Sequence, residues 1–243
     1  MKILLISDIH GNKEALQAVL QDLSYDTINV LGDIVGYMTN PEECTHLIHK
    51  YDCIIGNHDY VVSVNSSLIK YFNPLAQKAI LWTKDNISPE TINFLKNLPF
   101  QKVYKKLNYT IAHGDITDQN FNYIEYNYQA RNNFSIMETP ILFIGHTHVP
   151  CIWEMKNLEW KPIQTTYFPP MNTKIYLNPN SKYIVNIGSV GQPRDKNSKS
   201  CCVIFDTDDY SIEYKRISYD IKTTIQKIKQ YNLPSFLHER LIK

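Results

Sequence analysis

The chain has 243 residues, of which 43% are hydrophobic and 20% are charged, and its 25 basic and 24 acidic residues give a formal net charge of +1. These values are typical of an ordinary globular protein, and the balanced charge excludes an overall field that would favour nucleic acid or an anionic membrane. Any affinity for an anion such as phosphate must therefore come from a local site. Because there is no internal repeat or flexible linker, we expect one domain over residues 1–243.

The cysteines and the N-terminus indicate where the protein works. The five cysteines show no Cys-x-x-Cys spacing, which is typical of free thiols in a reducing compartment. The apolar stretch at the N-terminus is too short for a signal peptide, and no stretch approaches the roughly 20 apolar residues that span a bilayer. We therefore expect a cytoplasmic protein without a membrane partner.

Strands and helices alternate in the first part of the chain. Short apolar runs predict buried strands at residues 3–6, 28–31 and 53–55. Between them, residues 12–23 show helical spacing with Asn12 as N-cap, and a second helix begins at Asn40-Pro41. This order indicates a layered α/β fold with right-handed crossovers.

Residues 68–98 are helical in pattern throughout, with one segment beginning at Pro74 and another at Ser88-Pro89. Because these helices interrupt the strand alternation, we interpret them as an insertion. We expect it to lie beside the sheet edge where α/β proteins bind their ligands, and to influence which ligand is bound. Residues 118–132 are rich in Asn and Tyr and form either a helix or an ordered loop.

The second half of the chain is rich in β-structure, especially after His148. Apolar or alternating runs predict strands near residues 110–112, 141–144, 150–155, 174–177, 183–188, 201–206 and 211–217. A closing helix is predicted from Ile221 to Tyr231, and a short final helix begins at Pro234.

Five polar motifs occur along the chain, most of them directly after a predicted strand. They are Asp8-Ile9-His10, Gly32-Asp33, Gly56-Asn57-His58-Asp59, His113-Gly114 and Gly145-His146-Thr147-His148. Open α/β sheets place their ligands at the carboxyl ends of the strands, so we expect these side chains to converge there. Aspartate and histidine ligands suit divalent first-row metals, whereas an all-oxygen set would suit Mg²⁺ or Ca²⁺. The sequence therefore predicts a metal centre.

The spacing within the motifs adds detail. Side chains two apart in an extended segment point the same way, so Asp8 is expected beside His10, and His146 beside His148. Asp33, at the end of the neighbouring strand, is placed to bridge two ions. A lone Asp-x-His is usually a pair of exposed residues without a function. The ordered set of five motifs is far more specific for a metal site.

These motifs resemble those of the calcineurin-like metallophosphoesterase superfamily, and the chain is similar to small prokaryotic members grouped with diadenosine tetraphosphatases and phosphoprotein phosphatases. The resemblance covers at least residues 1–195, and residues 233–241 also look like that branch. It implies an α/β fold (α+β in some schemes) built as a four-layer αββα sandwich of two mixed β-sheets flanked by helices. It also implies two divalent metal ions, with Mn²⁺ expected first and Fe, Zn²⁺, Ni²⁺ or Co²⁺ as alternatives.

The resemblance also implies a role for each motif residue. One metal ion would be held by Asp8, His10, Asp33 and His148, and the other by Asp33, Asn57, His113 and His146. His58 would be the general acid. In such a centre the two ions share a hydroxide that attacks phosphorus, while the imidazole protonates the leaving group. The alternative for His58 is a packed histidine beside the site.

The chain departs from the phosphoprotein phosphatases after Asp33. That branch continues with a second Asp and a phosphate-binding Arg, whereas this chain continues with Ile34-Val35-Gly36-Tyr37. This difference argues against protein phosphatase activity. Asp59 is a candidate for orienting His58, and Arg194 is a candidate for the missing cation, although an exposed turn arginine is an equally good interpretation.

We therefore expect a dinuclear metal phosphoesterase that hydrolyses phosphate mono- or diesters, with dinucleoside polyphosphates as one candidate substrate. A general or cyclic-nucleotide phosphodiesterase is the alternative among enzymes, and a non-catalytic scaffold of the retromer type is the alternative of another class. A small phosphorylated molecule, such as a nucleotide, is the expected partner. No long nucleic acid is expected, because the sequence lacks a long basic stripe. The sequence does not indicate the oligomeric state.

Tyrosines near the expected metal edge are further candidates. Tyr123, Tyr126 and Tyr128 can stack on a nucleobase, because every base offers a π-face. Half-buried packing is the more common role of such side chains.

Overall fold

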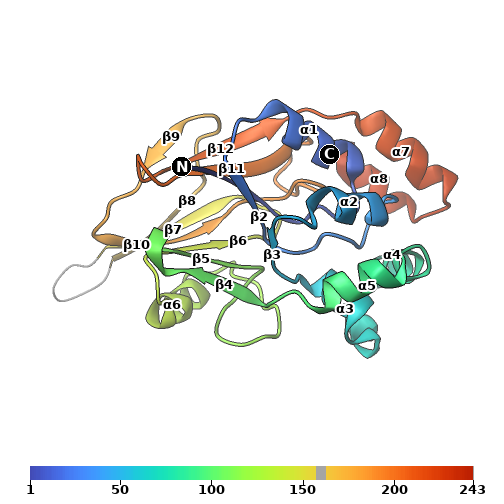
Figure 1. The fold of residues 1–243 in the computed structure, drawn as a ribbon, viewed down its shortest axis with the longest axis horizontal. Coiled ribbons are helices and arrows are strands. Elements are labelled where there is room, and N and C mark those ends of the chain that lie inside the picture. Colours follow the sequence, from blue (N-terminus) through green and yellow to red (C-terminus); the bar gives the residue numbers. More distant parts are fainter. Residues whose placement is uncertain (157–162, 243) are drawn as a thin grey trace.

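Two six-stranded mixed β-sheets pack face to face in the computed structural model, which describes residues 1–156 and 163–242 (Figure 1). Helices cover the outer faces of both sheets, so the predicted four-layer αββα architecture is confirmed.

The first sheet has the strand order β3-β2-β1-β11-β12-β9. Its strands are β1 (Lys2–Ile6), β2 (Thr27–Val30), β3 (Asp52–Cys53), β9 (Lys174–Tyr176), β11 (Ser200–Asp206) and β12 (Ser211–Ile217). Strands β1, β2 and β3 run parallel, whereas β11 pairs antiparallel with β1 and β12. The first strand of the chain therefore lies inside the sheet, between β2 and β11.

The second sheet has the strand order β4-β5-β6-β10-β7-β8. Its strands are β4 (Gln101–Tyr104), β5 (Tyr109–Ala112), β6 (Ile141–Ile144), β7 (Cys151–Lys156), β8 (Ile163–Tyr167) and β10 (Ser181–Asn186). Strands β5, β6 and β10 are parallel neighbours, and antiparallel strands flank them on both sides.

Alternation along the strands divides the apolar side chains between layers. In β1, Ile3 and Leu5 are packed between the sheets, whereas Leu4 and Ile6 belong to the cluster beneath the helices. Phe143 and Phe205 meet across the sheet interface with ring centroids 5.3 Å apart. Burial of these alternating faces on both sides explains why β1 and β6 are continuous apolar runs.

Helices α1 (Lys13–Asp22) and α2 (Pro41–Ile48) lie on the outer side of the first sheet, α7 (Ile221–Gln230) packs against α1, and α8 (Ser235–Glu239) packs against α7. On the outer side of the second sheet lies α6 (Asn127–Ile136), whose Phe134 packs in a cluster with Leu142 and Trp153. As predicted, Asn12 caps α1, because its side chain accepts a hydrogen bond from the backbone of Ala15.

The predicted helical insertion is confirmed. It consists of the 3₁₀ helix η1 (Ser66–Tyr71), α4 (Pro74–Asp85) and α5 (Pro89–Lys96), and the side chains of Asn73 and Ser88 cap the two α-helices. These helices lie beside α3 (Asn57–Ser63) at one end of the sheets (Figure 1).

Several boundaries differ from the sequence predictions. The third strand is shorter than predicted and covers only Asp52–Cys53. Ile54 and Ile55 are buried as predicted, but they belong to the connection between β3 and α3. Helix α3 and strands β4 and β8 were not predicted, and residues 118–126 form a loop that ends where α6 begins. Residues 157–162, which belong to the region after His148 that was predicted to be rich in β-structure, lie outside the described residues.

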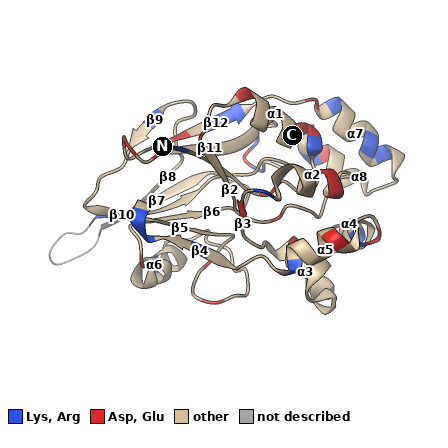
Figure 2. Ribbon diagram, viewed as in Figure 1, with Lys and Arg blue, Asp and Glu red and all other residues tan. Residues whose placement is uncertain are grey.

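Basic and acidic residues are interspersed over the helices and strands (Figure 2), in agreement with the net charge of +1. Among the described residues, no helix is both long and apolar enough to cross a membrane.

Candidate metal centre

The predicted ligands lie at one edge of the two sheets. Asp8 and His10 follow β1, Asp33 follows β2, His113 follows β5, His146 and His148 follow β6, and Asn57 begins α3. The aspartates and histidines among them are buried, and Asn57 is partly exposed. The structure therefore brings together all seven side chains that the sequence identified.

The backbone of these loops is not extended, so that part of the prediction is wrong. The residues with a left-handed backbone at this edge are Asp8 (φ 53°), His10 (φ 51°), Asp33 (φ 52°), His146 (φ 70°) and His148 (φ 63°). For a residue other than glycine this conformation costs roughly 1–2 kcal/mol. The side chains of Asp8 and His10 nevertheless converge, because Asp8 Oδ1 lies 3.8 Å from His10 Nε2. Strain of this kind is typical of functional sites.

Hydrogen bonds between neighbouring loops hold this backbone in place. The backbone N–H groups of Asp8 and His10 donate to the carbonyls of Gly32 and Asp33, at 3.0 and 2.9 Å. The backbone N–H of His146 donates to Asp8 Oδ2 at 3.0 Å, which links the two sheets at the site. The loops are therefore tied to one another by hydrogen bonds within the protein.

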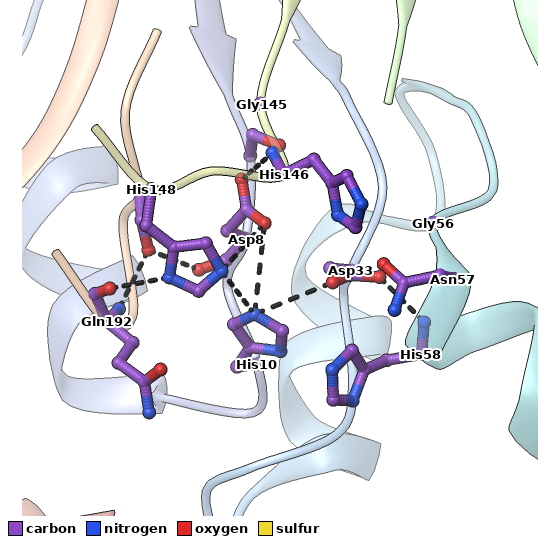
Figure 3. Close-up of polar contacts among 12 residues, drawn as sticks. Asp8, His10, Asp33, Gly56, Asn57, His58, Gly145, His146, His148 and Gln192 are labelled. Carbon is purple, nitrogen blue, oxygen red and sulfur yellow. Dashed lines mark hydrogen bonds and ion pairs between the residues drawn. The ribbon is translucent and has the colours of Figure 1, made fainter. Parts of the chain in front are cut away.

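The first group of ligand atoms comes from Asp8, His10 and His148, whose candidate atoms all lie within 4.8 Å of one another (Figure 3). His148 Nε2 is 3.1 Å from Asp8 Oδ1 and 3.2 Å from His10 Nε2. Two imidazole nitrogens and a carboxylate oxygen at these separations can ligate one divalent ion.

The second group comes from Asp33, His113 and His146, again with all candidate atoms within 4.8 Å of one another. Asn57 adds a neutral oxygen, because its Oδ1 is 3.1 Å from His113 Nε2. Asp33 Oδ2 lies 3.4 Å from His113 Nε2 and 3.6 Å from His10 Nε2, so it faces both groups. This carboxylate oxygen is therefore in position to bridge two ions.

Backbone carbonyls orient three of the imidazoles. The Nδ1 atoms of His10, His113 and His148 lie 3.2, 2.7 and 2.6 Å from the carbonyl oxygens of Val35, Leu31 and Gln192. A carbonyl can only accept, so each Nδ1 carries a proton, and each Nε2 faces the cluster, where it could bind a metal ion in its deprotonated form. This arrangement is common for metal-ligating histidines.

The donor set fits divalent metal ions. Asp8 Oδ1 is buried without a hydrogen-bond partner among the described residues, although it faces imidazole nitrogens. An unsatisfied buried carboxylate oxygen is costly unless a cation neutralises it. Although burial opposes ionisation, His148 and His113 hold the pKa of Asp8 well below its usual range. Carboxylate, imidazole and amide groups together suit first-row metals.

His58 lies beside the two groups and lines the adjacent cavity. Burial, and then the positive charge of Arg194 and the neighbouring histidines, lowers the pKa of His58 to about 4, despite the opposing effect of Asp33. Its Nδ1 is buried with no hydrogen-bond partner in the described residues. A ring nitrogen of His58 also falls within 4.8 Å of the ligand atoms of His10 and Asp33, so proximity alone does not distinguish an acid from a ligand.

Asp59 does not make the contact expected of an orienting residue, because His58 Nδ1 has no partner in the described part of the chain. Its oxygens instead accept hydrogen bonds from the backbone N–H groups of Val35 and Gly56, both at 3.0 Å. Burial, together with the nearby Asp33, raises the pKa of Asp59 to about 7. Asp59 thus joins the loop after β2 to the start of α3 and positions His58 only through the backbone.

A cavity of about 620 Å³ opens next to the cluster. Its wall includes His58, His146 and Asn57 from the candidate metal centre, aromatic side chains, and the guanidinium groups of Arg194 and Arg240. The sequence identified Arg194 but gave no role to Arg240, whose position depends on the path of the C-terminal segment. Residues of η1 and the two residues that precede α4, Phe72 and Asn73, also contribute, so the helical insertion borders the cavity as predicted.

The three candidate tyrosines differ in position. Tyr123 lines the cavity and stacks on the ring of His146, with centroids 4.0 Å apart and planes 9° apart. Tyr126 and Tyr128 are 61% and 64% exposed and stack on each other instead. Only Tyr123 among these three is therefore in place to meet a ligand in the cavity.

Comparisons with known proteins agree with this geometry. The family model for the calcineurin-like phosphoesterase superfamily domain matches residues 1–210. An uncharacterized protein of Methanocaldococcus jannaschii is 41% identical over 260 residues, which cover 98% of this chain and 96% of that protein. The crystal structure of a metallophosphoesterase from Sphaerobacter thermophilus is 34% identical with a TM-score of 0.85, over 99% of this chain and 98% of that one.

A more distant similarity involves a symmetrical bis(5'-nucleosyl)-tetraphosphatase of Sodalis glossinidius. It is 28% identical over 135 residues, which cover 49% of this chain and 45% of that protein.

Proposed function

Because the chain belongs to the calcineurin-like phosphoesterase superfamily, we propose that it hydrolyses phosphate mono- or diesters with two divalent metal ions. The observation that carries this proposal is the position of Asp33 Oδ2, which faces His10 Nε2 at 3.6 Å and His113 Nε2 at 3.4 Å. A single carboxylate oxygen between two ligand groups is the arrangement that a dinuclear centre requires.

Each ion has a proposed set of ligands. One would be held by Asp8, His10, Asp33 and His148, and the other by Asp33, Asn57, His113 and His146. When bound, two such ions lower the pKa of a shared water and offset negative charge on the phosphoryl oxygens. Mn²⁺ is the first candidate, and Fe, Zn²⁺, Ni²⁺ and Co²⁺ suit the same donors.

His58 is the proposed general acid. Its ring lines the cavity and is enclosed by Tyr37, His10 and Phe72, at centroid distances of 4.5, 4.8 and 5.0 Å. With a pKa lowered to about 4 by burial, the ring is neutral at pH 7 until a charged substrate is present. To act as the acid the ring must take up a proton, which the negative charge of a bound phosphate ester would favour and the positive charge of the metal ions would oppose. The imidazolium then donates its proton to the leaving oxygen, a contribution of ~10²–10⁴-fold in comparable enzymes.

Dinucleoside polyphosphates are a second candidate substrate class. The similarity to a bis(5'-nucleosyl)-tetraphosphatase favours this class, and the cavity of about 620 Å³ has the volume of a site for a whole small molecule. The aromatic side chains in its wall offer faces on which a base can stack.

The test is hydrolysis by metal-stripped protein that has been reloaded with Mn²⁺. Three substrates separate the classes: p-nitrophenyl phosphate, bis(p-nitrophenyl) phosphate and diadenosine tetraphosphate. We expect His58→Ala to keep both ions and to lower kcat ~10²–10⁴-fold, because only the proton donor is removed.

His46→Ala is the matched control, since the side chain of His46 is 66% exposed on α2, and it should behave as the wild type. Loss of metal from the His58→Ala protein would show that His58 is a ligand. Full metal loading without turnover of any substrate would contradict the phosphoesterase proposal and support a scaffold role.

A further inference from the structure

Two arginines from distant parts of the chain reach the cavity beside the candidate metal centre. Arg194 lies in the loop between β10 and β11, and Arg240 begins the 3₁₀ helix η3 (Arg240–Ile242). The neighbours Leu237 and Leu241 are buried in a cluster with Tyr37, so the C-terminal segment is anchored at the site. Position 240 lies beyond residue 210, where the family match ends. Arg240 therefore comes from outside the part of the chain that carries the proposed ligands.

Gln192 holds the two guanidinium groups together. Its Oε1 accepts hydrogen bonds from Arg194 Nη2 at 2.9 Å and from Arg240 Nη1 at 3.4 Å. The backbone carbonyl of the same residue accepts from His148 Nδ1 at 2.6 Å. Gln192 is fully buried and lies on the His148 side of the cluster, away from Asn57 (Figure 3). The arginine pair is therefore fixed relative to one side of the proposed metal centre.

Neither guanidinium is neutralised by the protein. In residues 1–156 and 163–242, no carboxylate forms an ion pair with Arg194 or Arg240, whereas Arg216 pairs with Asp195. Arg240 instead lies over the ring of Phe236, with its Cζ 4.1 Å from the centroid. Burial, and then the charge of Arg194, lowers the pKa of Arg240. Two adjacent cations that repel each other at a cavity wall form a site for an anion.

We propose that Arg194 and Arg240 together bind a second phosphoryl group of the substrate, next to the one at the metal ions. This inference rests on the proposed function and narrows its substrate to compounds with two or more linked phosphates, such as nucleoside diphosphates and polyphosphates. The proposed metal centre would bind the reacting phosphoryl group, and the adjacent cavity of about 620 Å³ has room for more than one such group. Guanidinium groups suit this task because they bind phosphate oxygens in a bidentate manner.

The test measures binding and does not require turnover. Protein loaded with saturating Mn²⁺ is titrated calorimetrically with AMP and with α,β-methylene-ADP, which differ by one phosphoryl group and its methylene bridge. We expect the wild type to bind the diphosphate analogue at least ~10-fold more tightly. Arg240→Gln should lose roughly 10- to 100-fold in affinity for the analogue, because charge-assisted hydrogen bonds are lost. Its affinity for AMP should stay within about fivefold, as expected for a distant, screened charge.

Two further variants control the experiment. Arg131→Gln makes the same change at an exposed position on α6 and should match the wild type for both nucleotides. Arg240→Lys keeps the charge but loses the bidentate geometry, so we expect a loss smaller than that of Arg240→Gln. This graded series distinguishes lost binding from lost folding.

The inference is overturned if the wild type shows no preference for the diphosphate analogue, or if Arg240→Gln weakens both nucleotides by the same factor. It fails independently of the proposed function. A preference for the analogue without hydrolysis of any ester would support the arginine site and contradict the phosphoesterase proposal. Hydrolysis of simple esters without a preference for the analogue would support the phosphoesterase proposal and contradict the arginine site.

Discussion

Substitution of Gly36 by alanine is expected to displace the proposed general acid without removing any proposed ligand. Gly36 has φ +132°, and a Cβ atom built there would lie 2.4 Å from His58 Nδ1. Ordinary van der Waals contact begins at 3.4 Å, so the added methyl group is about 1 Å too close. The His58 ring is enclosed by Tyr37, His10 and Phe72 and has little room to withdraw.

The size of the effect follows from this geometry. A backbone conformation that only glycine adopts readily costs an alanine roughly 1–3 kcal/mol. At about 2–4 °C per kcal/mol for a protein of this size, Tm should fall by several degrees. Misplacement of a reacting group by about 1 Å can lower a rate by ~10²-fold. We therefore expect a Gly36→Ala protein that is folded, fully metal-loaded and about 100-fold slower.

The assay combines steady-state kinetics on the best substrate, elemental analysis of the bound metal and thermal unfolding. A double-mutant cycle isolates the cause, because Gly36→Ala should have little further effect on kcat once His58 is alanine. Unchanged kcat in the single variant would refute the reasoning. So would an equal, independent rate loss in the double variant, since the effect would then not pass through His58.

Two further predictions concern the metal centre. Asp33→Asn should weaken both ions together by more than ~10–100-fold, because the oxygen facing His10 and His113 loses its charge; elemental analysis showing one ion fully retained would argue against the bridge. Burial lowers the pKa of His113, but Asp33, Asp8 and the Leu31 carbonyl together raise it, to about 9 in the metal-free protein. Metal binding should therefore release a proton below pH 9 and become tighter as pH rises towards 9. Calorimetry in buffers of different ionisation enthalpy measures the number of protons released, and a value of zero would contradict this prediction.

Most of the fold can be predicted from the sequence because its central strands are buried on both faces. Continuous apolar runs such as residues 3–6 and 141–144 are typical of strands in this position, and the polar residues that follow them mark the sheet edge. Helix α3 was missed because Val61 and Val62 favour strands, whereas its position is set by the hydrogen bonds that Asp59 makes at its start. Local propensity is overridden there by a tertiary contact.

The site shows the same division between local and tertiary information. Residue types and spacing identified the side chains of the cluster, but nothing in Asp8 or His146 reveals that their backbone is left-handed. Arg240 could not be assigned from the sequence, because its place at the cavity depends on how Leu237 and Leu241 anchor the C-terminal segment. The contact through Gln192 joins residues 48 positions apart, which no local pattern encodes.

The position of β1 inside its sheet has a consequence for synthesis on the ribosome. One edge of β1 pairs with β2, which follows soon after in the sequence. The other edge pairs with β11, which is translated much later and places Asp206 opposite Lys2. While the residues between Ile6 and Ser200 are being translated, the emerging chain exposes an apolar strand with unpaired N–H and C=O groups. Such an edge can recruit strands from other nascent chains. Formation of this sheet is therefore a late, non-local event, and chaperone binding to the N-terminal segment would protect the chain until β11 is available.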